Sequence, residues 1–229
     1  MNVSAIIPVA GRGKRFGGPL PKQYLELHGQ PVICLTLRVF VDLPLISGGV
    51  VVAAADEIDR LSTYLEKIDG FSAKFRIVEG GKERQESVYS GLQQIPSVTD
   101  IVIVHDGVRP LLTQTILIKS IEAADRYGAC VAAVPVKETV KKVKRNKVIE
   151  TIPRADLWLA QTPQTFRYTI LKEAHDRAHR SGFFSTDESA LVEWAGYPVQ
   201  VVPGAYSNIK ITTQEDLKMA ANLHEERRV

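Results

Sequence analysis

The chain has 229 residues, of which 45% are hydrophobic and 24% charged, and 29 Lys and Arg against 26 Asp and Glu leave a formal net charge of +3. This apolar content is ordinary for a globular protein and excludes disordered and fibrous classes. The small net charge argues against a dedicated nucleic-acid coat protein, yet it allows a local basic pocket for a small anion. The length favours one large domain, so we expect a single domain over residues 1–229.

The cysteines and the N-terminus bear on location. Cys34 and Cys130 lie in apolar runs, where a cysteine is expected to be a small buried hydrophobic residue. No CxxC pair occurs, so the sequence supports neither a zinc ribbon nor a redox motif, and a disulfide framework is not expected. No targeting segment is visible, and the apolar run near 45–55 is shorter than the about 20 residues of a membrane span. We therefore expect a cytoplasmic protein that binds neither membranes nor nucleic acid.

In the first 136 residues, short apolar runs alternate with longer segments of helical periodicity. The runs predict strands at 3–9, 50–54, 75–78, 101–104 and 131–136. The periodic segments predict helices at 31–43, 57–67, 83–94 and 113–126. Apolar strands separated by helices indicate a mostly parallel sheet that is covered on both faces. The sequence therefore predicts a three-layer α/β fold with right-handed crossovers.

The alternation stops at a basic segment, 137–156, which holds six Lys or Arg between Lys137 and Lys147. Arg145-Asn146 could turn a hairpin between VKKVK and KVIETI. We expect an arm over 137–160, either as a solvated surface hairpin or as a contact with a partner subunit or an anionic substrate. Farther along, the pattern predicts helices at 168–181, 187–195 and 214–226, a strand at 199–202 and a short extended piece at 208–211.

The segment after the first predicted strand is rich in glycine and in basic residues. Glycines let the backbone approach a ligand and present N–H groups to it, and here they stand at 11, 13, 17 and 18. Three bases, Lys14, Arg15 and Lys22, suggest that this ligand is a phosphate held at the carboxyl end of a strand. The segment is neither a G-x-G-x-x-G fingerprint nor a Walker A loop, because Phe16 and Pro8 stand where those motifs need glycine.

Two further segments carry candidate site residues. Asp106 and Arg109 follow the strand predicted at 101–104, where a carboxylate can hold Mg²⁺ and a guanidinium can hold an anion. The plainer interpretation of Asp106 is a helix N-cap or a loop salt bridge to Arg109. Gly81 and Ser87 flank the start of a predicted helix and suit a base or ribose, unless the segment is a plain loop-to-helix start.

One pair of histidines imitates a metal motif. His175 and His179 are four residues apart on a predicted helix, as in H-E-x-x-H, but Asp176 replaces the glutamate and no third ligand is evident. We therefore expect this helix face to lie at the surface. The sequence also contains neither a G-x-S-x-G elbow nor a Ser-His-Asp arrangement.

Taken together, these segments resemble the nucleotidyltransferases that activate sugars and polyols, and most closely the 2-C-methyl-D-erythritol 4-phosphate cytidylyltransferases. The matching pieces run in the family's order from residue 10 to residue 217: AGRGKRFGGPLPKQYLELHGQPV, GGKERQESV, VHDGVRP, PVKETVKKV, TIPRADLWLAQTPQTF, STDESALVE and NIKITTQEDL. The resemblance implies a Rossmann-like nucleotidyltransferase fold. It also implies that CTP and methylerythritol phosphate give cytidine diphospho-methylerythritol and pyrophosphate, in the non-mevalonate route to isoprenoids.

The resemblance assigns roles around the reacting phosphates. Arg15 and Lys22 would stabilise charge at the α-phosphate of CTP. Asp106 would bind Mg²⁺ or another divalent cation and help place the acceptor, with Arg109 beside it. The residues implied to contact the nucleotide are Ala10, Gly11, Gly13, Gly81 and Ser87.

The resemblance also implies a homodimer. Thr139 and Arg154, on the arm, would reach into the neighbouring subunit's site, while Thr186 and Lys210 would complete the acceptor pocket. An acceptor phosphate is already ionised, so alignment and charge neutralisation suffice and no general base is needed.

Some positions depart from the family's pattern. Gly107-Val108 stands where the family often has Ala-Ala, Glu138 where it usually has Asp, and Pro153 where it often has Asp. Val108 also occurs in ribitol 5-phosphate cytidylyltransferases. The alternatives are therefore a ribitol 5-phosphate cytidylyltransferase and, from another class, a catalytically silent nucleotide-binding protein.

Overall fold

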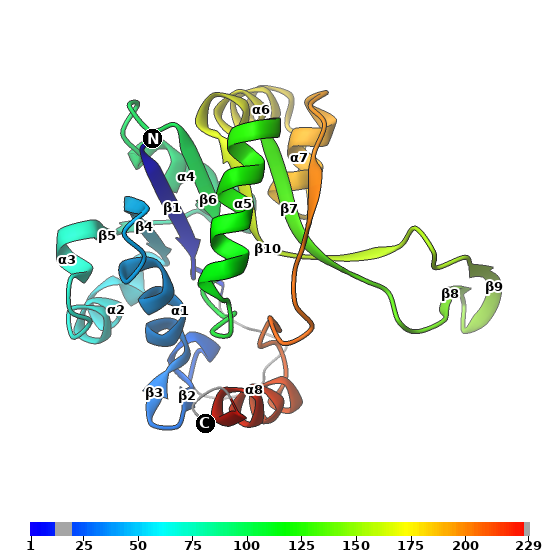
Figure 1. The fold of residues 1–229 in the computed structure, drawn as a ribbon, viewed down its shortest axis with the longest axis horizontal. Helices are drawn as coiled ribbons and strands as arrows, with labels where there is room; N and C mark the ends of the chain where they lie inside the picture. The colour runs from blue at the N-terminus through cyan, green and yellow to red at the C-terminus, as the bar shows by residue number, and fades with distance from the viewer. Residues whose placement is uncertain (12–19, 227–229) are drawn as a thin grey trace.

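The computed structural model describes residues 1–11 and 20–226. Within this part of the chain, a seven-stranded sheet has the order β11-β7-β10-β6-β1-β4-β5 (Figure 1). Its strands are β1 (Val3–Pro8), β4 (Ile46–Ala53), β5 (Phe75–Glu79), β6 (Ile101–Val104), β7 (Ala129–Pro135), β10 (Trp158–Arg167) and β11 (Gln200–Pro203). The pairs β1–β4, β1–β6, β4–β5 and β7–β11 are parallel, which confirms the predicted, mostly parallel sheet.

Of the strands of this seven-stranded sheet, the sequence patterns missed β10, which runs antiparallel to both β6 and β7. Its middle is polar, so it shows no apolar run, yet Gln161, Thr162, Gln164 and Thr165 are all buried. These side chains are buried because they find hydrogen-bond partners elsewhere in the chain, as Thr165 does by donating to Ser120 Oγ at 2.9 Å.

Helices cover both faces of the sheet (Figure 1). They are α1 (Val32–Val41), α2 (Ile58–Leu65), α3 (Phe71–Lys74), α4 (Arg84–Gln94), α5 (Gln114–Tyr127), α6 (Tyr168–Ser181), α7 (Glu188–Trp194) and α8 (Gln214–Glu226). Alternate residues of a strand face opposite layers. Ala5 and Ile7 of β1 accordingly belong to the core cluster that includes α1 and α5, whereas Ile6 belongs to the cluster with α4, α6 and α7. The predicted three-layer architecture is confirmed.

The predicted arm is a two-stranded hairpin that projects from the body (Figure 1). Its strands are β8 (Val140–Lys144) and β9 (Lys147–Ile152). The turn falls at Arg145 and Asn146, whose φ angles are +49° and +61°. Two consecutive positive φ values at the centre of a two-residue turn match the twist of antiparallel strands. The hairpin is therefore confirmed where the sequence placed it.

Toward the C-terminus the structure contains one predicted helix and one irregular segment. The helix predicted at 214–226 is α8, which packs with a small hairpin of β2 (Glu26–Leu27) and β3 (Gln30–Pro31). The extended piece expected at 208–211 is irregular rather than a strand. Two short 3₁₀ helices, η1 (Lys22–Tyr24) and η2 (Ala55–Glu57), complete the elements of the described chain.

Only His179 of the histidine pair lies at the surface as expected. His175 is buried at 2% exposure, and its ring stacks on Tyr89 at a centroid distance of 5.7 Å. His179 stacks on the same Tyr89 ring at 5.2 Å. Among the described residues there is no group of three or more His, Cys, Asp or Glu that could hold a metal. Cys34 and Cys130 are free and buried, as predicted.

No helix in residues 1–11 and 20–226 combines the length and the apolar character that a membrane crossing requires.

Candidate active site

A pocket opens where β1, β5 and β6 end. Its wall combines the loop after β1, the loop between β5 and α4, and the segment after β6, so three strand ends that are distant in sequence meet at one edge. This edge is the usual ligand site of a parallel α/β sheet. The lining residues used below are Ala10, Gly11, Lys22, Gly81, Glu83, Arg84, Ser87, Asp106 and Lys210.

Asp106 is the electrostatic centre of this pocket. Its side chain is 8% exposed and forms ion pairs with Arg84 Nε at 3.3 Å, Arg109 Nε at 3.3 Å and Lys210 Nζ at 3.0 Å. Burial alone would raise its pKa, but Arg84, Lys210 and Arg109 outweigh that effect and hold the pKa of Asp106 well below its usual range. Asp106 therefore stays ionised throughout the physiological pH range.

Arg109 lies behind Asp106 rather than on the pocket wall. Its Nη1 donates to the backbone oxygen of Asn208 at 2.7 Å, and its side chain is 10% exposed. The plainer interpretation of the sequence, a loop salt bridge between Asp106 and Arg109, describes this contact. Arg109 thus supports Asp106, and among the described residues the Lys and Arg that line the pocket are Lys22, Lys82, Arg84 and Lys210.

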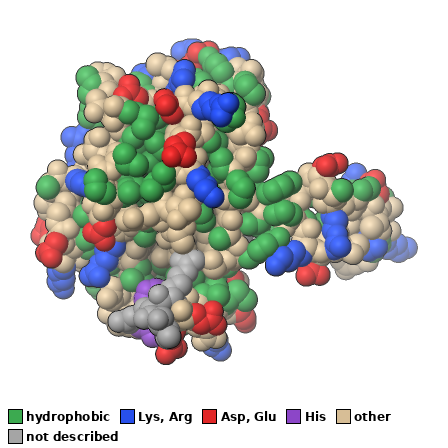
Figure 2. Space-filling view, viewed as in Figure 1, with side chains coloured by type: hydrophobic (Ala, Val, Ile, Leu, Met, Phe, Trp, Pro, Cys, Tyr) green, Lys and Arg blue, Asp and Glu red, His purple; other side chains and the backbone are tan. Residues whose placement is uncertain are grey.

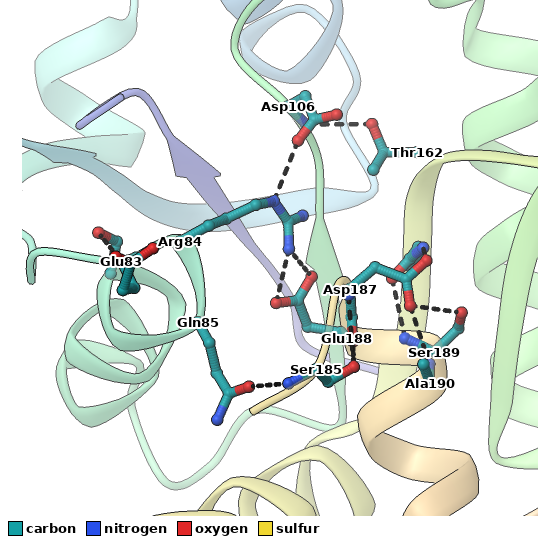
Figure 3. Close-up of polar contacts among 12 residues, drawn as sticks. Glu83, Arg84, Gln85, Asp106, Thr162, Ser185, Asp187, Glu188, Ser189 and Ala190 are labelled. Atoms are coloured by element: carbon teal, nitrogen blue, oxygen red, sulfur yellow. Dashed lines mark hydrogen bonds and ion pairs between the residues drawn. The ribbon is translucent and has the colours of Figure 1, made fainter. Parts of the chain in front are cut away.

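Sequence reasoning missed Arg84 and Glu188, which the structure joins to Asp106 (Figure 3). Arg84 Nη1 donates to both carboxylate oxygens of Glu188, at 2.9 and 2.7 Å, while its Nε faces Asp106. The Glu188 side chain is 1% exposed. Burial raises the pKa of Glu188, and the Arg84 guanidinium opposes that rise. Arg84 lies in the segment GGKERQESV and Glu188 in STDESALVE. The sequence signal that could have found them was therefore a charged residue inside each of these two motifs.

The loop before α4 carries the predicted nucleotide contact Gly81, and the first turn of α4 carries the other, Ser87. Glu86 Oε2 accepts from the backbone N–H groups of Lys82 at 2.8 Å and Glu83 at 3.2 Å, which caps the helix. A Cβ at Gly81 would come within 2.4 Å of Glu86 Cβ, so the turn requires glycine there. Ser87 Oγ donates toward the backbone oxygens of Glu83 at 3.0 Å and Gly81 at 3.3 Å. The loop is therefore held in one shape along the pocket wall.

The loop after β1 is described in part. Ala10 and Gly11 line the pocket, and a Cβ at Gly11 would have nothing within 4 Å. Lys22 begins η1, and the next residue ties this helix to β1, because Gln23 Nε2 donates to the backbone oxygen of Val9 at 3.3 Å. The predicted residues Gly13, Lys14 and Arg15 lie outside the described residues.

Besides Arg109, three predicted acceptor-side residues do not line this pocket. Thr139 and Arg154 are exposed on the arm, where the Arg154 guanidinium donates to the backbone oxygen of Lys137. Thr186 is exposed in the loop before α7, two residues from Glu188. Of the acceptor-side set, the structure therefore gathers Asp106, Arg109 and Lys210 within this single chain.

Gly107, a departure from the family pattern, has a steric explanation. A Cβ at this position would lie 2.2 Å from Val9 Cγ1 and 2.9 Å from Ile33 Cδ1. Here those two side chains fill the space that an alanine methyl group would need.

Fold and site together define the class: an α/β protein of the nucleotidyltransferase type, with a basic, glycine-lined pocket at the carboxyl edge of its sheet. The model of the 2-C-methyl-D-erythritol 4-phosphate cytidylyltransferase family matches residues 3–226. The chain belongs to this family, which confirms the resemblance drawn from its sequence segments and the expectation of a cytidylyltransferase enzyme.

Relatives in sequence and structure agree along nearly the whole length. The cytidylyltransferase of that name from Geotalea uraniireducens is 45% identical over 222 residues, covering 96% of this chain and 95% of the relative. Its counterpart from Alkaliphilus oremlandii is 42% identical over 226 residues, covering 98% and 96%. The crystal structure of 4-diphosphocytidyl-2C-methyl-D-erythritol synthase from Anaerococcus prevotii superposes with a TM-score of 0.85 at 33% identity, covering 98% of both chains. That of the cytidylyltransferase from Thermus thermophilus gives 0.82 at 32% identity, covering 98% of this chain and 100% of the other.

Proposed function

We propose that this chain transfers CMP from CTP to 2-C-methyl-D-erythritol 4-phosphate at the pocket around Asp106, within a single domain over residues 1–229. The observation that carries the assignment to this pocket is one ionised carboxylate held among Arg84, Arg109 and Lys210 at the carboxyl edge of the sheet. Such a site suits a ligand with several phosphates, because the surplus cations can neutralise it.

The step needs alignment and charge neutralisation rather than a proton acceptor. An oxygen of the acceptor phosphate attacks the α-phosphorus of CTP, a new P–O bond forms, and the bond to the β-phosphate breaks to release pyrophosphate. Lys22 and Lys210 line the pocket, and Arg15 joins them through the family resemblance. Cations placed where charge develops lower the barrier of such a transfer.

The imidazole nearest to Asp106 supports a mechanism without a general base. His105 is fully buried, its Nε2 lies 3.3 Å from the backbone oxygen of Arg109, and its ring packs on Phe40. Burial lowers the pKa of His105 to about 3. A side chain so enclosed has no path to a substrate proton, and the acceptor phosphate brings its own ionised oxygen.

Asp106 fits the role of a single protein ligand for Mg²⁺. Mg²⁺ is commonly held by one or two carboxylates together with substrate phosphates and water, and Asp106 is an ionised oxygen donor on the pocket wall. Both of its oxygens face cations in this structure, so Asp106 would have to give up one of these ion pairs to hold a metal. A bound Mg²⁺ or another divalent cation would supply further charge neutralisation at the phosphates.

The arm suits a contact between two copies of the chain. Its strands and base expose large apolar side chains, and Figure 2 shows hydrophobic atoms gathered where the arm leaves the body, with Lys and Arg farther along. The exposed residues include Val143, Val148, Ile149, Trp158 and Leu159. Apolar surface of this extent on a projecting element is typical of an interface. We therefore include in the proposal a cytoplasmic homodimer in which the 137–160 arm carries Thr139 and Arg154 toward the partner's site.

Pyrophosphate release with CTP and Mg²⁺ tests the proposal, run in parallel with 2-C-methyl-D-erythritol 4-phosphate and ribitol 5-phosphate. We expect release with the first acceptor, and loss of that release in Asp106→Asn. Release with ribitol 5-phosphate alone would overturn the acceptor but keep the reaction. Binding of CTP without release with either acceptor would point to the silent nucleotide-binding alternative.

A further inference from the structure

Glu188 is a buried carboxylate that the reaction itself does not require. It is the first residue of α7, its side chain is 1% exposed, and the cation that faces it is Arg84. Withdrawing a carboxylate from water is unfavourable unless it is paired and hydrogen-bonded. The two short bonds from Arg84 supply that pairing, so Glu188 and Arg84 depend on each other.

Arg84 is shared between two carboxylates that come from different parts of the chain. Its Nη1 binds Glu188 while its Nε lies 3.3 Å from Asp106 Oδ1. A guanidinium is planar and its donors have fixed directions. Fixing Nη1 on Glu188 therefore also fixes the direction from which Nε meets Asp106, and a rotation of one contact disturbs the other.

Glu188 is itself held firmly. The preceding residue, Asp187, caps α7 by accepting from Ala190 N at 2.9 Å, and its other oxygen accepts from Gln164 Nε2 at 2.9 Å. Gln164 Oε1 in turn accepts from Ser189 N at 2.9 Å, on the far side of Glu188. The start of α7 is thus fastened to β10, and Glu188 cannot follow Arg84 if the guanidinium shifts.

The loop that contains Thr186 is fastened to the same helix as Arg84. Ser185 N donates to Gln85 Oε1 at 2.8 Å (Figure 3). Gln85 Nε2 donates to the backbone oxygen of Phe183 at 2.9 Å. Gln85 directly follows Arg84 on α4. One short stretch of α4 therefore sets both the Asp106 contact and the course of the loop that leads to Thr186.

We propose that Glu188 is a positioning residue for the cytidylyl transfer. It anchors Arg84, so that Arg84 holds the Asp106 carboxylate in a fixed orientation relative to the loop that contains Thr186. This inference rests on the function proposed above. Glu188 acts through Arg84, and Arg84 acts through Asp106, so neither has to touch the reacting atoms. Loss of Glu188 should impair use of the acceptor, because this chain of contacts ends at Asp106 and at the Thr186 loop, and both belong to the predicted acceptor side.

A double-mutant cycle with Glu188→Gln and Arg84→Met tests the dependence. We expect Glu188→Gln to lower kcat/KM for the acceptor by about 10-fold, while KM for CTP changes by less than about 2-fold. In the Arg84→Met background the same Glu188 substitution should change kcat/KM by less than about 2-fold, because the path through Arg84 is already broken. A merely structural role would lower the amount of folded enzyme without dividing the effect between the two substrates.

Arg84→Lys provides a second variant that preserves the charge. A lysine keeps the cation but cannot hold two carboxylates in one plane. We expect it to resemble Glu188→Gln in acceptor use, whether or not Arg84→Met folds. Wild-type behaviour of Arg84→Lys would show that charge alone suffices and would overturn the positioning role.

Glu173→Gln is the matched control, because Glu173 is a half-exposed glutamate of α6 that pairs with Arg177 at 3.8 Å. It should leave both kinetic constants unchanged. The inference would be overturned if Glu188→Gln behaved like this control, or if it had equal effects in both Arg84 backgrounds. Turnover by the wild-type chain would leave the proposed function standing in either case. A wild-type chain inactive with both polyol phosphates would instead overturn the proposed function, and the inference with it.

Discussion

Arg109 and Asn208, 99 residues apart in sequence, are joined by a buried hydrogen bond in which Arg109 Nη1 donates to the backbone oxygen of Asn208 at 2.7 Å. Asn208 is fully buried, and its amide nitrogen donates to the backbone oxygen of Thr162 at 2.8 Å. The segment that carries Lys210 is thereby tied to β10 and to the segment after β6. This arrangement explains how an irregular stretch places the Lys210 ammonium 3.0 Å from Asp106.

Asn208→Ala should therefore affect both stability and activity. The substitution leaves the buried carbonyl of Thr162 without its donor, which typically costs about 1–3 kcal/mol of unfolding free energy. It also removes a hydrogen bond that fixes the segment carrying Lys210, so we expect kcat to fall by about 10-fold. Urea unfolding and pyrophosphate release measure the two effects. Asn222→Ala, at an exposed position of α8, is the control, and a fully stable and active Asn208→Ala would show that Lys210 needs no such support.

Lys22 lines the pocket at the start of η1, and its predicted role is to stabilise charge at the α-phosphate of CTP. Lys22→Ala should lower kcat by about 10²–10³-fold, the usual scale for the loss of one donor to a transition state. Its unfolding transition should stay close to that of the wild type, because the side chain is on the pocket wall. Lys119→Ala, an exposed lysine of α5, should have no effect. Wild-type turnover in folded Lys22→Ala would reject the role.

The sequence predicted those parts of the molecule whose signals are local. Strands such as Ile101–Val104 are apolar at every position because both faces of the sheet are covered. The hairpin at Arg145-Asn146 likewise depends on neighbouring residues. In contrast, β10 escaped detection, because a buried Gln164 looks like a loop residue until its partner Asp187 is known.

The difference between local and long-range signals also explains which site residues the sequence predicted. Asp106 and Lys22 were found because each follows a strand or a glycine-rich segment. The pairing of Arg84 with Glu188 spans 104 residues and exists only once α4 and α7 pack beside the sheet. No spacing rule connects two charges that far apart, so their partnership emerges from the fold.

The arm yields a prediction about assembly. If Arg154 acts in the partner's site, Arg154→Ala should raise KM for the acceptor and leave KM for CTP nearly unchanged. Lys144→Ala, an exposed arm residue in β8, serves as the control. Light scattering across micromolar concentrations should give the mass of a dimer, and a monomer mass would contradict the proposed assembly.

Mixing two damaged variants tests the shared site more directly. A heterodimer of Lys22→Ala and Arg154→Ala chains contains one site with both defects and one site with neither, provided that the arm crosses between subunits. Random reassortment of equal amounts should then restore about one quarter of wild-type activity. If each arm served its own chain, every site would keep one defect and mixing would restore nothing.

His175 predicts how stability depends on pH. Its ring is buried against Tyr89, and burial, with a smaller effect of Arg84, lowers its pKa to about 4, although Asp176 opposes the shift. The unfolded chain binds a proton near the ordinary histidine pKa of about 6.5, so between that pH and pH 4 the unfolded state holds more protons than the native state. Stability from this residue is therefore complete above about pH 6.5 and is lost as the pH falls toward 4.

His175→Phe tests this pH dependence, because it keeps an aromatic ring against Tyr89 without a titrating group. Between pH 7 and pH 5 its unfolding free energy should fall by about 1–2 kcal/mol less than that of the wild type, as measured by urea unfolding at each pH. Parallel curves for His175→Phe and the wild type would show that His175 takes up its proton without unfolding the chain.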